Sequence, residues 1–141
     1  MEQRLTIVGL GVSDLKSATQ FYEEKFGWRK TESSNDSISF FQMNGILLSL
    51  YPREKLAEDA KVSNEGSGFK GFTIAFNARS KEEVDAIFED LKQKGVAIVK
   101  PAEEVFWGGY SGYVADMDGN LWEIAFNPFL AMDEKGNTSE V

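Results

Sequence analysis

The chain of 141 residues contains neither cysteine nor histidine. The absence of cysteine excludes disulfides, thiolate metal sites and cysteine nucleophiles. The absence of histidine removes the commonest zinc ligand and the usual general base near neutral pH. Catalytic triads and zinc chemistry are therefore excluded.

Basic residues are also scarce, with 15 lysines and arginines against 23 acids and a net charge of -8. This balance opposes binding to nucleic acid or to an anionic membrane, which require a basic surface. No apolar run approaches the roughly 18 residues of a membrane span. The early apolar stretch is too short for a signal peptide. We therefore expect a soluble cytoplasmic protein with no nucleic-acid or membrane partner.

Apolar residues are plentiful, at 42% hydrophobic and 13% aromatic, which argues against disorder. The length fits one compact domain, or two small halves that share one core. A chain of this size buries roughly two-thirds of its unfolded surface on folding. Stabilisation by a disulfide or a structural metal is therefore not needed.

Two segments carry helix signals. The first begins with Ser13 as N-cap and Asp14 in the first turn, continues with apolar residues at helical spacing, and ends at Gly27. The second begins at Ser80, with a capping-box glutamate three residues later, and ends at Gly95. The two helix starts lie about half the chain apart.

Strand-like runs are arranged in the same way around both helices, with one run before each helix and three after it. They are residues 5–12, 28–33, 37–43 and 46–51 in the first half, and 72–77, 96–100, 110–115 and 121–127 in the second. The order β-α-β-β-β thus occurs twice, which indicates an internal duplication. We predict an α+β fold in which two βαβββ modules form a curled mixed sheet around one cleft, with the helices outside.

Two short segments predict hairpin turns. Asn44-Gly45 is a strong two-residue hairpin signal. Residues 116–120 resemble a calcium loop but lack its bidentate acid, so a turn is the better interpretation.

The chain is expected to form a single domain, residues 1–141. Within it we place module 1 at about 4–53, a linker at about 54–70, module 2 at about 71–128 and a tail at 129–141 that frays. The linker begins with a stretch that could form a short charged helix. A loop that closes over a ligand site is the functional alternative for this segment.

An acid, Glu123, lies within the apolar and aromatic run at 121–127. Side chains alternate between the two faces of a strand. The heavier row, Trp122, Ile124 and Phe126, should pack under the helices, so Glu123 should face the concave side. The same reasoning directs Ser49, Tyr51 and Thr73 to the concave side of their own strands.

The chain resembles the vicinal oxygen chelate superfamily, which includes glyoxalase I, extradiol dioxygenases, fosfomycin-modifying enzymes and bleomycin-resistance proteins. The residues that carry the resemblance are VGLGVSDLKSATQFYEEKFGW, FTIAFNARSKEEVDAIF and SGYVADMDGNLWEIAFNPF, within about residues 4–128. The resemblance implies two βαβββ modules around one cleft, a homodimer, and lyase- or dioxygenase-like activity.

Enzymes of this family usually hold a divalent metal on the concave strands through histidines and glutamates. The corresponding positions here are Ile7, about Ser49, Thr73 and Glu123. Of these four, only Glu123 is an effective metal ligand, and a lone carboxylate does not hold a zinc, nickel or iron ion against water. We therefore expect no metal and no other cofactor.

The favoured hypothesis is a metal-independent protein that binds a small molecule in an aromatic cleft, with Glu123 holding a cationic or hydrogen-bond-donating group. Trp107 precedes two glycines, whose mobility would let it cap the pocket. The expected ligand-binding residues are Glu123, Trp107, Tyr110, Tyr113, Tyr51, Ser49, Thr73 and Phe41.

Two alternatives remain open. In the first, Glu123 is the general base of a metal-independent lyase or isomerase, or of a glyoxalase-like enzyme of unknown substrate, and Tyr113 donates a proton. In the second, the cleft is filled, Glu123 pairs with Arg79, Lys100 or Arg4, and the chain is a structural or regulatory module.

Overall fold

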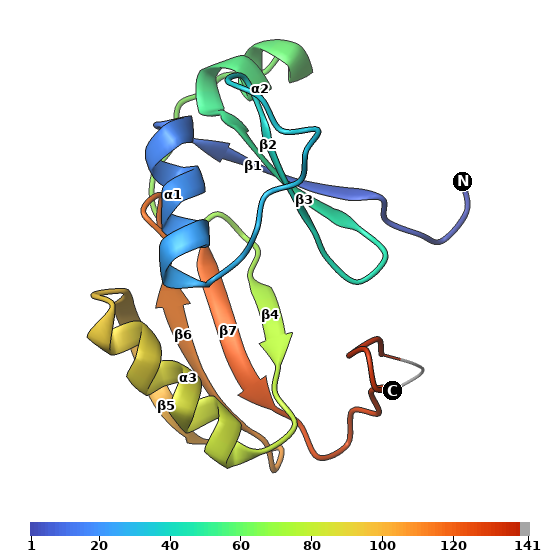
Figure 1. The fold of residues 1–141 in the computed structure, drawn as a ribbon, viewed down its shortest axis with the longest axis vertical. Coiled ribbons are helices and arrows are strands. Elements are labelled where there is room, and N and C mark those ends of the chain that lie inside the picture. Colours follow the sequence, from blue (N-terminus) through green and yellow to red (C-terminus); the bar gives the residue numbers. More distant parts are fainter. Residues whose placement is uncertain (139–141) are drawn as a thin grey trace. The chain divides into compact units, whose positions relative to one another are not determined.

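The structure is a computed structural model that describes residues 1–138. It divides into two compact units, Met1–Gly68 and Phe69–Val141. Within the described residues there are three helices and two mixed sheets, of three and four strands (Figure 1). The predicted α+β class with two related modules is confirmed.

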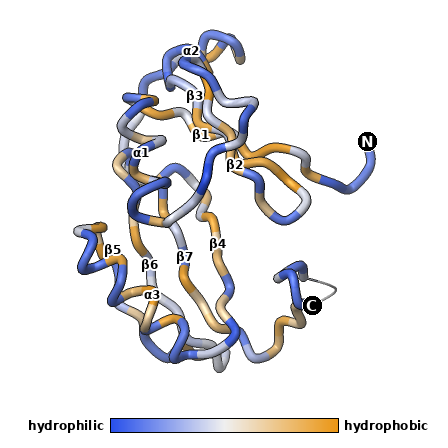
Figure 2. The backbone as a smooth tube through the Cα atoms, in the orientation of Figure 1, coloured by the Kyte–Doolittle hydropathy of each residue, from blue (hydrophilic) through white to orange (hydrophobic). Residues whose placement is uncertain are grey.

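The first unit contains the elements β1 (Ile7–Val12), α1 (Leu15–Lys25), β2 (Ser39–Gln42), β3 (Leu47–Pro52) and α2 (Arg53–Ala60). Its strand order is β1-β3-β2, with β1 parallel and β2 antiparallel to β3. The hairpin predicted at Asn44-Gly45 joins β2 to β3, and the amide of Met43 donates to the Ile46 carbonyl at 2.9 Å. Hydrophobic residues gather in β3, whereas α2 is largely hydrophilic (Figure 2).

The strand predicted at residues 28–33 does not form. Lys30 makes only an isolated bridge to Phe41 in this stretch. The reason is aromatic packing, because the Trp28 ring stacks on Tyr22 of α1 with centroids 5.5 Å apart. That contact holds Trp28 beside the helix, and only Lys30 and Thr31 of this segment pair with β2.

The core of the first unit lies between α1 and one face of its sheet. Tyr22 of α1 is fully buried and packs against Phe41 of β2. Leu10 and Leu50 fill the same face from β1 and β3. Leu50 alternates along β3 with Ser49 and Tyr51, which the sequence assigns to the opposite face.

Asp14 rather than Ser13 caps the first helix, which corrects the predicted start by one residue. The Asp14 carboxylate accepts a hydrogen bond from the Ser17 amide at 2.7 Å, and its backbone is extended, as an N-cap requires. This hydrogen bonding with Ser17 lowers the pKa of Asp14. Ser13 and Asp14 are both good caps by residue type, and only the backbone geometry distinguishes them.

The second unit contains β4 (Ile74–Asn77), α3 (Lys81–Gln93), β5 (Ala97–Glu104), β6 (Tyr110–Ala115) and β7 (Leu121–Phe126). Its strand order is β4-β7-β6-β5, with β4 parallel to β7 and the other pairs antiparallel.

The strand β5 extends past the predicted end at residue 100. Two register shifts, from Ile98 to Lys100 and from Lys100 to Glu103, interrupt its pairing with β6. Such irregularities accommodate Pro101, whose missing N–H would break a regular ladder. The strand therefore continues through a proline that normally ends one.

The core of the second unit lies between α3 and one face of the four-stranded sheet (Figure 1). Val84 of α3, Ala78 and Ile124 of β7 form its buried centre. The residues packed around this centre are Ile87, Phe88, Ala102, Tyr110 and Phe126. The predicted cap of α3 is confirmed, since the Glu83 amide donates to the Ser80 hydroxyl at 3.1 Å.

The turn between β6 and β7 is organised by Asp116, which is 7% exposed. One carboxylate oxygen accepts from the amides of Asp118 and Asn120, at 2.9 and 2.8 Å, and the other accepts from the Asn120 side-chain amide at 2.8 Å. Lys70 donates to the Asp118 carbonyl at 2.9 Å. The predicted turn is confirmed.

The described part of the tail contains a second turn of the same design, and the end of the tail, where fraying is predicted, lies outside the described residues. Asp133 accepts from the amides of Lys135 and Asn137 and from the Asn137 side chain. Arg79 donates to the carbonyls of Asp133 and Glu134 at 2.9 and 3.1 Å. The tail thus folds back as far as residue 138, and residues 139–141 lie outside the described residues.

The turns organised by Asp116 and Asp133 differ in burial, so we expect them to contribute differently to the free energy of unfolding. Asp116→Ala should lower the free energy of unfolding by about 2 kcal/mol, since it leaves buried donors without an acceptor. Asp133→Ala removes the same set of bonds at an exposed site, where water replaces them, and should cost less than about 1 kcal/mol. Urea unfolding of both variants measures the difference, and equal losses would contradict it.

Candidate functional site

The site is built on the face of the four-stranded sheet that lies opposite α3. In β7, Trp122 and Ile124 are each 4% exposed, and Ile124 belongs to the core under α3. Glu123 alternates with them and is half-buried on the other face. Its cross-strand neighbours are Ala75 of β4 and Tyr113 of β6. The predicted face of Glu123 is confirmed within this unit.

Tyr113 is the direct partner of Glu123. Burial, the negative charge of Glu123 and the hydrogen bond from the phenol to the Glu123 carboxylate raise the pKa of Tyr113. The positive charge of Lys100 acts in the opposite direction. The phenol therefore stays protonated at neutral pH, and it lies beside a carboxylate on the same face of the sheet.

Small side chains surround the remaining sides of the Glu123 carboxylate. Ala75 lies beside it on β4, and Ala125 follows it on the same face of β7. Ala75 is exposed. Neither methyl group has the length to cover a glutamate, and Glu123 itself is half-buried.

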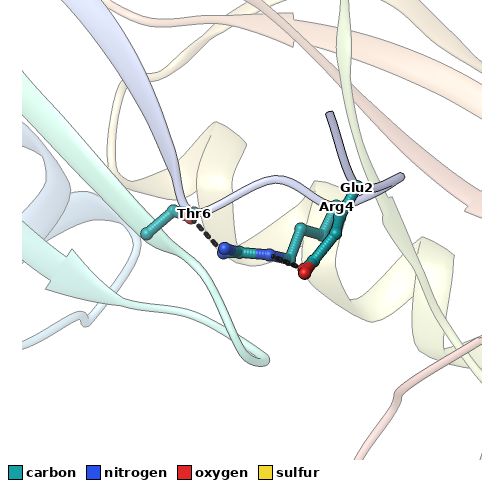
Figure 3. Close-up of polar contacts among 3 residues, drawn as sticks. All are labelled: Glu2, Arg4 and Thr6. Atoms are coloured by element: carbon teal, nitrogen blue, oxygen red, sulfur yellow. Dashed lines mark hydrogen bonds and ion pairs between the residues drawn. The ribbon is translucent and has the colours of Figure 1, made fainter.

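The three basic residues considered as partners of Glu123 are engaged elsewhere. Lys100 forms an ion pair with Glu103 at 3.0 Å, and Arg79 binds the tail carbonyls described above. Arg4 pairs with Glu2 at 2.7 Å and also contacts Thr6 (Figure 3). The cross-strand neighbour of Glu123 is the phenol of Tyr113, and none of these cations pairs with it.

Tyr110 lies on the opposite face of β6 from Tyr113. Its hydroxyl donates to Asp85 of α3 at 2.7 Å, and Lys81 lies 5.9 Å from its ring centroid. The hydrogen bond to Asp85, followed by burial, raises the pKa of Tyr110. The structure therefore does not bring Tyr110 together with Glu123, and it provides a second tyrosine–carboxylate pair for comparison.

The two tyrosine–carboxylate pairs allow a prediction about the pKa values of the tyrosines. Glu123→Gln should lower the pKa of Tyr113, because it removes a negative charge beside the phenol, but burial should keep this pKa above 10.0. Asp85→Asn should act on Tyr110 alone. Ring-carbon NMR titration of the tyrosines checks both shifts, and an unchanged Tyr113 in Glu123→Gln would contradict the pairing.

The sign of the stability effect follows from the raised pKa of Tyr113. In the unfolded chain the phenol titrates near 10.0, and in the folded protein it titrates higher. The stability contribution is therefore complete below pH 10.0 and is lost as the pH rises through the folded value. The loss of stability at high pH should be smaller in Glu123→Gln, because the pKa of Tyr113 in the folded variant lies closer to its value in the unfolded chain.

Trp107 belongs to the tight turn between β5 and β6, where the Val105 amide donates to the Gly109 carbonyl at 3.0 Å. Its indole covers Gly109 so closely that a methyl group there would lie 1.9 Å from the ring. Trp107 is nevertheless 38% exposed. The indole is thus seated on the backbone of its own turn, and the structure places it at the end of the strands rather than in the Glu123 row.

Ser49 and Tyr51 lie on the sheet face of the first unit that faces away from α1, as predicted. Ser49 is 6% exposed and pairs with Gly9, where a methyl group would approach the Ser49 hydroxyl to 3.3 Å. Tyr51 is half-buried. Phe41, by contrast, is 1% exposed in the core under α1 and is not available to a ligand.

Thr73 precedes β4 and is exposed. It lies two residues before Ala75, the β4 neighbour of Glu123. A hydroxyl at this position can donate or accept a hydrogen bond but carries no charge.

The residues present do not fit a transition-metal site of the kind that the fold family commonly holds. Ile7 offers no donor, and the hydroxyls of Ser49 and Thr73 are weak neutral ligands beside the single carboxylate of Glu123. Among residues 1–138, no three acidic side chains gather as a metal site would require. No chemical step is therefore assigned to a metal.

The sequence suggests Lys100 only as an ion-pair partner of Glu123, whereas the structure places it beside Tyr113. It pairs with Tyr113 in the ladder, next to the register shift in β5. Alternation counted from residue 96 cannot assign a face beyond such a shift, so the sequence contains no direct signal for its position.

A sequence profile of the Glyoxalase/Bleomycin resistance protein/Dioxygenase superfamily matches residues 4–124. The chain belongs to this superfamily. A glyoxalase-related enzyme from Fulvimarina pelagi is 36% identical, with a TM-score of 0.89 and 99% of both chains covered. None of the helices in residues 1–138 is long and apolar enough to cross a membrane.

More distant structures share the fold alone. A glyoxalase/bleomycin resistance protein/dioxygenase from Nocardioides is 22% identical with a TM-score of 0.76, and the match covers 100% of this chain and 91% of that one. A lactoylglutathione lyase from Agrobacterium tumefaciens is 22% identical with a TM-score of 0.70, covering 89% and 95%. This superfamily membership agrees with the resemblance drawn from the sequence.

Proposed function

We propose that the protein binds a small molecule without a metal, and that Glu123 anchors a cationic or hydrogen-bond-donating group of this ligand. The observation that carries the proposal is the Glu123–Tyr113 pair. The half-buried Glu123 lies between a tyrosine on one neighbouring strand and an alanine on the other, and its carboxylate has several acceptor positions. A ligand cation or N–H donor satisfies those positions in the bound state.

Metal independence is part of the proposal and rests on the types of donor available. Elemental analysis of protein purified without added metal should find no stoichiometric zinc, nickel, iron or manganese. Stoichiometric metal that is lost in Glu123→Gln would overturn this part of the proposal.

An amine probe tests the anchor directly. Biphenyl-4-ylmethylamine carries one cation on an aromatic apolar body, and calorimetric titration measures its affinity. Glu123→Gln should weaken it roughly ten- to a hundredfold, as expected for one hydrogen bond to a charged group. Asp85→Asn, which removes a matched tyrosine-bound carboxylate from the opposite face, should leave the affinity unchanged. Equal affinity in the wild type and in Glu123→Gln would refute the anchor role.

A metal-independent lyase or isomerase is the second candidate function. Tyr113 and Glu123 are cross-strand neighbours, so a carboxylate that can act as a base lies beside a phenol that can act as an acid. In this reaction Glu123 would take a proton from the substrate and Tyr113 would donate one. If a turnover assay is found, Tyr113→Phe and Glu123→Gln should both lower kcat; full activity of Glu123→Gln would exclude the base role.

We also propose that the protein is a cytoplasmic homodimer. Both β1 and β4 are edge strands within their own sheets, and Ile7 and Phe76 on them are 47% and 43% exposed. Exposed apolar edge strands are sites of association. Sedimentation equilibrium should give twice the mass of the chain, and a monomer at micromolar concentration would contradict this.

A further inference from the structure

We propose that the site accepts a dipolar ligand, with its cationic end at Glu123 and an anionic end, a carboxylate or phosphate, at Lys100. This inference rests on the proposed function, because it adds a second anchor to the same face. Glu123, Tyr113 and Lys100 form one cross-strand row through β7, β6 and β5. The row presents an acid, a phenol and an ammonium group in that order.

The geometry of the row sets the span of the ligand. Neighbouring strands lie about 4.8 Å apart, so two strand intervals separate the backbones of Glu123 and Lys100 by roughly 10 Å. Tyr113 occupies the middle position and offers an aromatic surface between the two charges. A rigid, flat ligand of this length, charged at both ends, matches the row.

Lys100 is available for such a role because its present partner is exposed. The Lys100 side chain is 40% exposed and that of Glu103 is 61% exposed, at an ion-pair distance of 3.0 Å. Exposed ion pairs contribute only about 0–1 kcal/mol. An anionic ligand group can therefore replace or share the contact with Glu103 at little cost.

The register shifts on either side of Lys100 are the second structural feature of this anchor. They isolate Lys100 as the paired residue between two irregular stretches of β5. Such irregularities redirect side chains and are over-represented next to functional sites. The electrostatic effect of Lys100 on Tyr113 agrees with a position of the ammonium group near the phenol.

Two matched probes test the inference by calorimetry. One is biphenyl-4-ylmethylamine, and the other is 4'-(aminomethyl)biphenyl-4-carboxylate, which adds an anionic end. The wild type should bind the carboxylate probe about tenfold more tightly, equivalent to about 1.4 kcal/mol. Lys100→Gln should abolish this preference by weakening the carboxylate probe, while the amine probe binds as well or better because a repelling charge is gone.

Two further variants make the test specific. Glu103→Gln frees Lys100 from its competitor and should increase the preference for the carboxylate probe. Lys92→Gln removes the same charge from an exposed position on α3 and should leave the preference intact. Urea midpoints of all variants verify that they are folded.

The possible outcomes distinguish the dipolar-ligand proposal from the proposed anchor role of Glu123. Glu123-dependent binding of the amine probe with no preference for the carboxylate probe, or a preference that survives in Lys100→Gln, overturns the dipolar ligand and leaves the anchor role of Glu123 standing. Failure of the wild type to bind either probe overturns both.

Discussion

Tyr22→Ala is expected to lower the free energy of unfolding of the first unit by about 4 kcal/mol. The ring is fully buried and lies at the centre of an aromatic cluster. Its centroid distances are 5.5 Å to Phe21, 5.2 Å to Phe26, 5.5 Å to Trp28 and 5.8 Å to Phe41. Removing the ring creates a cavity that rigid aromatic neighbours cannot close.

Tyr22→Phe is the matched control, because it keeps the ring and removes only the hydroxyl. Its cost should be about 1 kcal/mol. Urea unfolding followed by tryptophan fluorescence measures both, since Trp28 stacks on Tyr22. A loss below about 2 kcal/mol in Tyr22→Ala would mean that the cluster is not the centre of the core.

Gly112→Ala is expected to lower the free energy of unfolding of the second unit by about 3 kcal/mol. Gly112 lies on β6 beside Tyr113, and its α-carbon faces β5 and α3. An added methyl group would lie 2.6 Å from the Lys100 carbonyl oxygen, 2.6 Å from the Phe88 ring and 2.7 Å from the Ala102 nitrogen. Two of these atoms belong to the backbone of β5, so relief requires the strand itself to move.

Gly9→Ala provides the comparison for this prediction. A methyl group there would meet only the Ser49 hydroxyl, at 3.3 Å, and a small rotation of that side chain relieves the contact. The expected loss is below about 1 kcal/mol. Because Gly112→Ala also displaces β5 from β6, it should alter the titration of Tyr113, and a stable variant with an unaltered Tyr113 would contradict the packing.

The face on which Glu123 lies was predictable from alternation alone. Its neighbours Trp122 and Ile124 are large and apolar, and burial of that row leaves the acid only the opposite face. The same rule separates Tyr110 from Tyr113, because two residues that are three positions apart on an unbroken strand point to opposite faces. The prediction that both tyrosines line one cleft is therefore wrong for Tyr110, which lies on the α3 side.

Phe41 illustrates a second signal that the sequence contains. The hairpin at Asn44-Gly45 pairs Phe41 with Leu48, and the alternation of β3 directs Leu48 to the helix side. The register of the hairpin therefore places Phe41 in the core. The second Asp-x-x-Gly-Asn turn, at 133–137, repeats the pattern of 116–120 and was also available from the sequence.

Other features depend on tertiary packing that one sequence does not specify. The segment after Gly27 has strand-like composition, but the contact between Trp28 and Tyr22 prevents a ladder. The position of Lys100 depends on register shifts that arise from pairing between strands. Part of the candidate site is therefore predictable. The face of Glu123 follows from alternation, whereas the position of Lys100 beside Tyr113 follows only from the fold.

The most direct test of the account is a ring-carbon NMR titration of tyrosine-labelled protein with biphenyl-4-ylmethylamine in excess chelator. We expect the signals of Tyr113 to shift and saturate, those of Tyr110 to stay unchanged, and Glu123→Gln to abolish the change. Binding that requires added zinc or nickel, or that leaves Tyr113 unaffected, would contradict a metal-free anchor at Glu123.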